Sequence, residues 1–437
     1  MRVIIIGAGV VGYTIAKRFS SEGQDVVLIE TDEKRISDVK EHLDVRIVHG
    51  SGSSPQALLE AGIEKAEMVI AVTDSDEVNM VACLIAESQS RVPKKVARIR
   101  NPEYTNYTKI FEKDYIDLDL NINPERVAAE KILKIIEVPG AVDTADFFDG
   151  QLKLVGCRVK ADSKAVGVTT KDMKGLYQGS SLLVVAIYRG LETIIPNGKT
   201  IIKADDLVFA LTPSPEASNI PKLFSGAHTK AHKVLVIGGG NVGAYIAEQM
   251  ESIKGTQIKI IERNKDRSTY LAEHLNKTIV IAGDGTDQSL LEEENIGDTD
   301  TFIAVTDDEE ANILTSLLAK RLGAQRCIAL IDKPEYLSMV STVGIDVAVS
   351  PRLVSVSEIL QFVRKGKIVC VKTLPEERVE AIETVAMETS DIVGKTLDEI
   401  DFPNGAIIGA VAKEDGDVKL AKGDTILGPG DSVVIFA

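Results

Sequence analysis

At 437 residues the chain is too long for a single hydrophobic core, and its length predicts two to four domains. A composition that is 44% hydrophobic and 27% charged is typical of a soluble globular protein, and the longest apolar runs fall far short of the ~18 residues of a membrane span. The net charge of −16, without a long Lys/Arg block, argues against nucleic acid or anionic lipid as a partner. A basic protein surface is compatible with this charge, and the cytoplasmic loops of membrane proteins are rich in Lys and Arg. Four cysteines without a C-x-x-C pair indicate a reducing compartment.

The first part of the chain alternates apolar, Val- and Ile-rich runs with helical patterns. A helix is expected from Val11 to Glu22, closed by Gly23 at a position suited to a C-terminal cap. Near-continuous apolar runs favour parallel strands that are covered on both faces. We therefore expect an α/β fold with a doubly wound, Rossmann-like parallel sheet. The expected strands are 2–6, 26–29, 45–48, 68–72 and 95–99.

The same pattern returns in the second half of the chain. An apolar run leads into a G-x-G-x-x-G turn at Gly7 and again at Gly238, 231 positions later. Three further pairs of segments lie 232 or 233 positions apart, so the register of the repeat holds across a whole domain. They are 50–53 with 283–286, 71–74 with 304–307, and 102–104 with 334–336.

Each predicted sheet domain runs into a helix with a clear start signal. Asn123-Pro124-Glu125 opens one helix and Ser350-Pro351 opens the other. Short strands separated by turns follow each helix and predict a small α+β domain in each half. The expected domains are a nucleotide-binding domain at 1–122, a helix with a small domain at 123–210, a proline-containing linker at 211–230, a second nucleotide-binding domain at 231–349, and a second helix with a small domain at 350–437.

The two glycine turns have the features of a dinucleotide-binding loop. Gly7 makes the tight turn, Gly9 lets the backbone approach a pyrophosphate, and Gly12 allows close packing of helix on strand. The free N–H groups of the helix start, at Val10 and Val11, face the phosphates. The alternative is a tight turn without a ligand. The matching residues of the second copy are Gly238, Gly240, Asn241, Val242 and Gly243.

An acidic residue follows each glycine loop at the distance expected for ribose recognition. Glu30 lies 18 residues after Gly12, and Glu262 lies 19 residues after Gly243. A carboxylate at the end of the second strand accepts hydrogen bonds from an adenosine ribose diol and repels a 2′-phosphate. The pattern therefore favours NAD(H) or an adenine nucleotide over NADP.

Two further loops lie at the carboxyl ends of predicted strands, where such folds bind ligands. Ser51 and Asp284 lie in glycine-rich loops after the third strand of each copy. One interpretation is that these loops line the adenine or ribose side of the crevice. The alternative is that they are ordinary turns whose next residues, Ser54 and Asp287, cap a helix. Thr73-Asp74 and Thr306-Asp307 follow the fourth strand of each copy. The acidic residues there contact a ligand or favour the dipole of the next helix.

Arginines distinguish the two copies. Arg98 and Arg100 close the fifth strand of the first copy, and either they reach a phosphate or they lie in solvent. The matching segment of the second copy, 329–332, contains no arginine. Nucleotide binding is therefore expected mainly in the first half.

The sequence gives little support for catalysis. None of the five histidines lies in a G-x-S-x-G, H-E-x-x-H or comparable motif. His228 and His232 share the spacing of one helix face but fall in the expected linker, and no metal site is predicted. Duplicated nucleotide sites without a catalytic partner suggest a sensor rather than an enzyme. The alternative is an NAD-dependent oxidoreductase that uses one copy as its cofactor domain.

The ordered set of motifs resembles the family of Trk-type potassium uptake regulators, over essentially the whole chain. The residues that carry the resemblance are 5–12, 71–80 and 97–102, together with the duplicated order of domains. The domains of this family are called RCK or KTN domains. Many of them have an Asp in the G-D-G-T loop, where the first copy has Ser51 and the second copy has Asp284.

This resemblance implies a cytoplasmic, peripheral subunit on the inner face of the membrane, bound to a potassium-translocating membrane protein. It also implies a homo-oligomer, a dimer or a tetramer, since members of the family form dimers and rings, and it implies binding of NAD(H) or ATP/ADP. By resemblance, Gly7, Gly9 and Gly12 hold the phosphates, Glu30 the ribose, Asp74 the base side and Arg98 a phosphate. A regulatory module of another cation transporter or antiporter is the alternative. We expect the helices at Pro124 and Pro351 to pass ligand-driven motion to neighbouring subunits.

Overall fold

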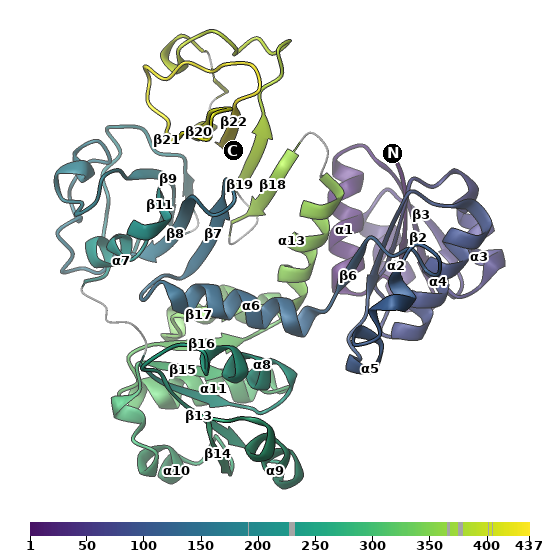
Figure 1. The fold of residues 1–437 in the computed structure, drawn as a ribbon, viewed down its shortest axis with the longest axis horizontal. Coiled ribbons are helices and arrows are strands. Elements are labelled where there is room, and N and C mark those ends of the chain that lie inside the picture. The colour runs from purple at the N-terminus through teal and green to yellow at the C-terminus, as the bar shows by residue number, and fades with distance from the viewer. Residues whose placement is uncertain (191, 227–231, 365–367, 375–378, 401, 404) are drawn as a thin grey trace. The chain divides into compact units, whose positions relative to one another are not determined.

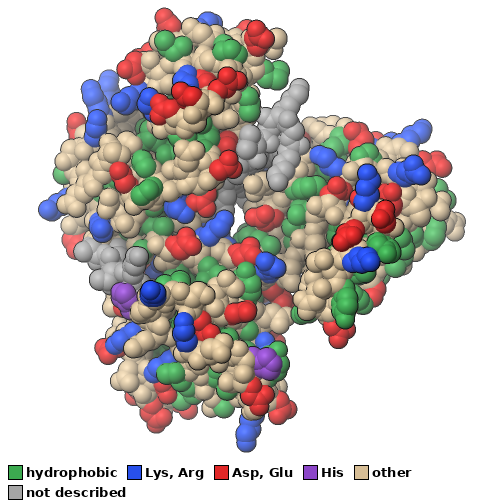
Figure 2. Space-filling view, viewed as in Figure 1, with side chains coloured by type: hydrophobic (Ala, Val, Ile, Leu, Met, Phe, Trp, Pro, Cys, Tyr) green, Lys and Arg blue, Asp and Glu red, His purple; other side chains and the backbone are tan. Residues whose placement is uncertain are grey.

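The computed structural model describes residues 1–190, 192–226, 232–364, 368–374, 379–400, 402–403 and 405–437 (Figure 1). Residues 1–128 and 350–362 form one compact unit, and residues 129–349 and 363–437 form the other. Within the described ranges, no helix has the length and apolar character needed to cross a membrane. Acidic and basic side chains are interspersed over the face drawn in Figure 2.

The first unit contains a six-stranded parallel sheet with the order β3-β2-β1-β4-β5-β6. The strand order reverses next to β1, where Ile4 pairs with Val27 of β2 on one side and Val69 of β4 on the other. This is the predicted doubly wound sheet, with the strands within two residues of their expected ends and one additional edge strand, β6. The strands are β1 (Arg2–Ile6), β2 (Asp25–Glu30), β3 (Arg46–His49), β4 (Met68–Ala71), β5 (Lys94–Arg98) and β6 (Leu120–Ile122).

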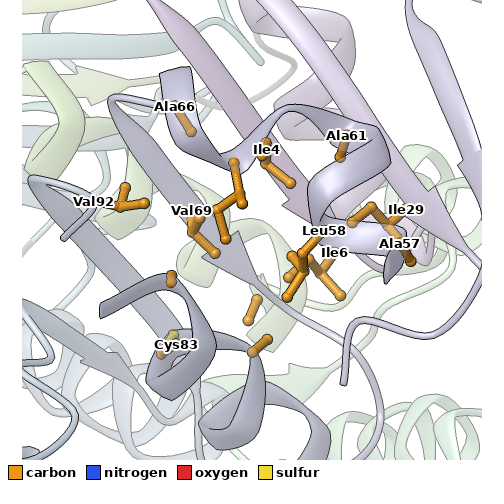
Figure 3. Close-up of a cluster of buried hydrophobic side chains, with 14 of the residues drawn as sticks. Ile4, Ile6, Ile29, Ala57, Leu58, Ala61, Ala66, Val69, Cys83 and Val92 are labelled. Atoms are coloured by element: carbon orange, nitrogen blue, oxygen red, sulfur yellow. The ribbon is translucent and has the colours of Figure 1, made fainter. Parts of the chain in front are cut away.

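Helices connect these strands and close a core on the sheet. Helix α1 ends at Ser21, and Gly23 follows with φ of +71°, a conformation that suits glycine at a helix C-terminus. Figure 3 shows Leu58 of α3 directed at Ile6 of β1, and both side chains are fully buried. The helices are α1 (Val10–Ser21), α2 (Glu33–His42), α3 (Pro55–Ala61), α4 (Asp76–Ser90) and α5 (Pro102–Thr105).

Two long helices begin where the sequence predicts them. At the start of α6 (Pro124–Glu137), the Asn123 Oδ1 atom accepts hydrogen bonds from the N–H groups of Glu125 and Arg126. At the start of α13 (Pro351–Arg364), the Ser350 hydroxyl oxygen accepts from the Leu353 N–H. Most of α13, residues 350–362, belongs to the same compact unit as the first parallel sheet.

The second unit contains the repeat of this sheet, with the order β14-β13-β12-β15-β16-β17. Its strands are β12 (Lys233–Ile237), β13 (Gln257–Glu262), β14 (Ile279–Ala282), β15 (Thr301–Ala304), β16 (Cys327–Leu330) and β17 (Val347–Val349). Its helices are α8 (Asn241–Met250), α9 (Lys265–His274), α10 (Gln288–Glu293), α11 (Glu309–Arg321) and α12 (Pro334–Val343).

Two small antiparallel sheets complete the second unit. The first has the order β10-β9-β11-β8-β7, with β7 (Asp143–Phe147), β8 (Leu152–Arg158), β9 (Leu183–Arg189), β10 (Glu192–Ile194) and β11 (Leu207–Pro213). The other has the order β18-β19-β22-β20-β21, with β18 (Ile368–Thr373), β19 (Glu380–Val385), β20 (Ile407–Ala412), β21 (Val418–Leu420) and β22 (Ser432–Phe436). The two sheets share one hydrophobic cluster, in which the Phe147 and Phe436 rings pack edge to face.

The linker expected at 211–230 differs from the structure over its first part. Residues 211–213 complete strand β11, and helix α7 (Asn219–Phe224) follows. Ile220 and Phe224 are fully buried in the core of the first small domain, so apolar burial outweighs the turn-like prolines of this segment. Residues 227–231, which include His228, lie outside the described residues.

Candidate functional site

The first glycine loop connects β1 to α1 and has the three features expected from its spacing. Gly7 has φ of +98°, and a Cβ atom there would lie 3.1 Å from the backbone nitrogen of Thr73. A Cβ atom on Gly12 would lie 1.9 Å from the carbonyl oxygen of Gly7, so only glycine lets α1 pack this close. A Cβ atom on Gly9, in contrast, would meet a single described atom within 4 Å, Arg35 Nη1 at 3.8 Å. The backbone at Gly9 is therefore open to a ligand at the N-terminus of α1, next to Val10 and Val11.

Glu30, at the end of β2, fixes this loop through a hydrogen bond to its backbone. Its Oε2 atom accepts a 2.6 Å hydrogen bond from the Ala8 N–H, and its Oε1 atom accepts from the N–H groups of Thr31 and Asp32. Burial raises the pKa of Glu30, but these backbone donors together bring the pKa below its usual value. The carboxylate is therefore ionised and is fixed beside the loop, although only 6% of the residue is exposed.

The loop after β3 uses its polar groups within its own turn. The Ser51 and Ser53 hydroxyl groups are 2.8 Å apart, and the Ser54 hydroxyl oxygen accepts from the Ala57 N–H at the start of α3. A Cβ atom on Gly52 would lie 2.2 Å from Ile6 Cγ2, so this glycine is needed for packing. The capping interaction weighed as an alternative for this segment is present, and the hydrogen bonds of Ser51 among the described residues stay within its own loop.

A buried asparagine joins the carboxyl ends of β4 and β5. The Asn79 Oδ1 atom accepts from the N–H and hydroxyl groups of Thr73, and its amide donates to the carbonyl oxygens of Thr73 and Arg98. Asp76, which is 6% exposed, accepts from the N–H groups of Arg100 and Asn101. These bonds fix the positions from which Asp74 and Arg98 extend.

Arginines surround the Asp74 carboxylate. Arg98 Nη2 donates to Asp74 Oδ1 at 2.9 Å, and Arg100 Nη2 donates to the Asp74 carbonyl oxygen. Arg35 lies between two carboxylates, 3.8 Å from Glu30 Oε2 and 4.0 Å from Asp74 Oδ2. Some desolvation raises the pKa of the largely exposed Asp74 carboxylate, but the adjacent guanidinium groups hold this pKa below its usual value. The edge of the sheet thus carries a continuous row of alternating charges from Glu30 to Arg98.

The second copy repeats the backbone of this site. Gly238 has φ of +99°, and a Cβ atom on Gly243 would lie 2.0 Å from the Gly238 carbonyl oxygen. A Cβ atom on Gly240 would meet no atom of the described residues within 4 Å, so this backbone, with Asn241 and Val242 beyond it, is open as in the first copy. Glu262 accepts from the Gly239 N–H at 2.6 Å. Asp284 accepts from the N–H and hydroxyl groups of Thr286, and these bonds lower its pKa.

The two copies differ in their charges at the ends of the fourth and fifth strands. Asn312 bonds to Thr306 and to the Leu330 carbonyl oxygen as Asn79 bonds to Thr73 and Arg98. Leu330 and Asp332 therefore stand where the first copy has Arg98 and Arg100. Asp307 is exposed and has no arginine within salt-bridge distance among the described side chains.

Arg35 is the residue of this region that the motifs did not identify. It lies one turn into α2, outside the glycine loop and the strand ends that sequence motifs describe. The repeat itself contains the signal, because Arg267 follows at the repeat distance of 232 and contacts its own glycine loop by donating to the Gly239 carbonyl oxygen. Elsewhere in the described residues, no group of three or more His, Cys, Asp or Glu side chains is arranged to hold a metal ion.

The first site therefore offers donors and charges that fit an adenine nucleotide. An open glycine backbone and a helix N-terminus suit a pyrophosphate, and the fixed Glu30 carboxylate suits a ribose. Arg98 and Arg100 suit a second anionic group on the other side of β1. The second site has the first two features and lacks the arginine pair.

Comparison with protein families gives two matches in each half. The TrkA-N domain model matches residues 3–124 and 234–351, and the TrkA-C domain model matches residues 154–225 and 382–437. Among curated proteins, the Trk system potassium uptake protein TrkA of Halomonas elongata is 38% identical over 439 residues, covering 100% of this chain and 95% of the relative. A TrkA homolog 1 of Methanosarcina mazei is 38% identical over 443 residues, covering 100% and 97%.

Solved structures of RCK proteins share the fold. The GsuK channel bound to NAD aligns with a TM-score of 0.62 at 18% identity, covering 100% of this chain and 76% of that one. GsuK bound to ADP aligns with a TM-score of 0.50 at 15% identity, covering 83% and 69%. Because both halves match the family models and full-length relatives cover the whole chain, the protein belongs to the TrkA family of potassium uptake regulatory proteins.

Proposed function

We propose that this chain is the cytoplasmic, nucleotide-sensing regulatory subunit of a Trk-type potassium uptake system. The observation that carries the proposal is the first glycine loop, where Gly9 is open while Gly7 and Gly12 are sterically restricted to glycine. A tight turn without a ligand requires glycine only at positions 7 and 12. The open Gly9, which lies between the hydrogen-bonded Glu30 carboxylate and the arginine pair, is explained by the close approach of a ligand.

An adenine nucleotide is the proposed ligand, either NAD(H) or ATP/ADP. The ionised, anchored Glu30 carboxylate suits a ribose diol and disfavours a 2′-phosphate. Neighbours of the same fold are described as bound to NAD and to ADP, which supports this ligand class. The proposed contact residues are Gly7, Gly9, Val10, Val11, Gly12, Glu30, Ser51, Thr73, Asp74 and Arg98, with Gly238, Gly240, Asn241, Val242, Gly243, Glu262, Asp284, Thr306 and Asp307 in the second copy.

The proposed partner is a membrane-embedded potassium-translocating subunit, approached from the inner face of the membrane by a homo-oligomer of this chain. The names of the relatives, which refer to Trk potassium uptake, support this partner. A nucleotide shifts such an assembly only by binding one conformation more tightly than another. Typical couplings of about 1–3 kcal/mol change the balance of two states by roughly 5- to 150-fold.

The open glycines give a sharper test than the crowded ones. Substitution of Gly12 or Gly243 displaces a helix, so loss of binding there has a purely structural explanation. Gly9→Ala and Gly240→Ala add a methyl group where the free protein has room, and they obstruct only a ligand. Calorimetric titration of the full chain with NAD⁺, NADH, ADP and ATP is expected to show binding that Gly9→Ala weakens by more than about tenfold, or roughly 1.4 kcal/mol.

Gly240→Ala is the matched variant. If the first site dominates, Gly240→Ala leaves the main binding event intact and removes at most a weaker second one. No binding of any of the four nucleotides to the wild-type chain would refute the proposal. Turnover of NADH with a hydroxy or keto acid would instead favour an oxidoreductase.

A further inference from the structure

The Arg98 guanidinium, on the side of the first site that suits an anion, has a buried hydrogen-bond donor without a partner among the described residues. The Arg98 side chain is 12% exposed, and its Nη2 atom donates to Asp74. Its Nε atom is buried and has no hydrogen-bond partner among the described residues. Burial and the neighbouring Arg100 lower the pKa of this guanidinium, which means that its charge is poorly stabilised. An unpaired buried donor on a cation is costly, and an anion with two or more acceptor oxygens would satisfy both nitrogens.

Asp74 occupies the place of such an anion in the free protein. Its side chain is 79% exposed, and it meets Arg98 at 2.9 Å and Arg35 at 4.0 Å. An exposed carboxylate in an ion pair contributes little to stability, so a more highly charged group displaces it readily.

The sheet order indicates which part of a nucleotide reaches this position. Glu30 ends β2 on one side of β1, whereas Asp74 and Arg98 follow β4 and β5 on the other side. A nucleotide whose ribose lies at Glu30 and whose first phosphate lies at the start of α1 extends its distal end toward Asp74. In ADP or ATP that end is a terminal phosphate, and in NAD it is the nicotinamide riboside.

We propose that Asp74 is an internal counterion of Arg98 that a terminal phosphate displaces, so that this residue sets the preference between nucleoside di- or triphosphates and dinucleotides. The terminal phosphate takes over Arg98 Nη2 and also satisfies Nε. A dinucleotide brings no terminal phosphate and leaves the Asp74–Arg98 pair in place. This inference rests on the proposed nucleotide binding and adds the basis of its selectivity.

The test is calorimetric titration of the full chain and its Asp74→Asn variant with ADP, ATP and NAD⁺. Removing the competing charge is expected to tighten ADP and ATP binding about three- to tenfold and to change NAD⁺ binding less than about twofold. Asp307→Asn is the matched variant. Leu330 stands where Arg98 would be, so no arginine is released and no gain for ADP is expected.

A double-mutant cycle separates this role from a general charge effect. In an Arg98→Met background, Asp74→Asn should no longer favour ADP over NAD⁺. The inference is overturned if Asp74→Asn leaves the ratio of ADP to NAD⁺ affinity unchanged, or if the gain for ADP persists without Arg98. Either result, with nucleotide binding still sensitive to Gly9→Ala, leaves the proposed function standing. If no nucleotide binds at all, both the proposed function and the role of Asp74 in selectivity are refuted.

Discussion

The two glycine loops differ in their second residue and in a buried residue of the helix that follows the second strand. A Cβ atom on Gly239 would lie 2.4 Å from Leu271 Cδ1, so an alanine at this position would force the Leu271 side chain to shift. In the first copy, the residues that correspond to Gly239 and Leu271 are Ala8, 231 positions earlier, and Val39, 232 positions earlier, and both are buried. Because valine is one methylene smaller than leucine, we infer that Val39 leaves the room that the Ala8 methyl group needs.

This pairing predicts a compensated double mutant. Gly239→Ala should destabilise the chain by about 1–3 kcal/mol through overpacking, and Leu271→Val by about 1 kcal/mol through loss of a buried methylene. Together they recreate the Ala8–Val39 arrangement, so the double variant should be more stable than the sum of the single changes predicts. Urea midpoints of the four proteins measure the coupling. Strict additivity would show that the contact with Leu271 does not determine residue 239.

Only some residues of the first site are predictable from the sequence. Spacing identifies Gly7 and Gly12, because their steric roles follow from any strand–turn–helix of this type. The neighbours of Asp74 are not predictable in this way. Arg35 reaches Asp74 from α2 and Arg98 reaches it from β5, and no local rule connects three separate segments at these distances.

Helix α13 shows how one element serves a part of the chain far from it in sequence. Its residues 350–362 belong to the unit that contains the first parallel sheet, and Val356, Ile359 and Leu360 of this helix are buried. The Lys94 ammonium group lies 5.9 Å from the centre of the Phe362 ring within the same unit. The first nucleotide domain therefore owes part of its core to the second half of the chain.

Ile359→Ala should accordingly weaken the first nucleotide domain. Truncating a fully buried isoleucine costs about 2–5 kcal/mol, and hydrogen exchange should accelerate in strands β1, β4 and β5 rather than in β12, β15 and β16. Ile246→Ala, on helix α8 and also fully buried, is the matched change and should have the opposite distribution. Faster exchange in β12, β15 and β16 after Ile359→Ala would contradict the assignment of α13.

Element type and order were predictable because the periodicity of apolar residues is strong in the strands and the caps are explicit. The Asn123 and Ser350 caps illustrate this, since each forms the hydrogen bonds that its residue type predicts. Helix α7 differs from the linker that the sequence predicts, because Pro213, Pro215 and Pro221 favour an irregular segment when only the local sequence is considered. Burial of Ile220 and Phe224 depends on partners that are distant in sequence.

At the scale of the whole molecule, a buried acid lies where the two small domains meet. Glu383 of β19 is 5% exposed, and its Oε2 atom accepts from the Phe148 N–H at 3.2 Å. Burial raises the pKa of Glu383 above its usual value of 4.5, and the nearby Asp149 acts in the same direction. The folded state therefore binds this proton more tightly than the unfolded state does.

The sign of the resulting pH effect follows from linkage. A raised carboxyl pKa makes unfolding easier as pH rises from the unfolded value through the folded one. Glu383→Gln keeps an acceptor for Phe148 and removes the charge, so it should raise the melting temperature near pH 7, with the gain disappearing below about pH 4.5. Glu388→Gln, on an exposed residue of the same domain, is the control. A gain that is the same at every pH would exclude ionisation of Glu383 as its cause.

The repeat predicts the architecture of the whole chain but not how its parts share a core. Equal spacing of 231 to 233 residues shows that two similar folds follow one another. It contains no information on the hydrophobic cluster that joins the two small sheets, because Phe147 and Phe436 meet through packing that no repeat distance encodes.

The placement of α13 has a consequence for synthesis on the ribosome. The last residue that completes the first nucleotide domain, residue 362, follows residue 122 by 240 positions. At about 5–20 residues per second, translation therefore leaves this domain without its final helix for roughly ten to fifty seconds. The domain made first is completed almost last, and a nascent chain interrupted before residue 350 releases both nucleotide folds with one of them unfinished.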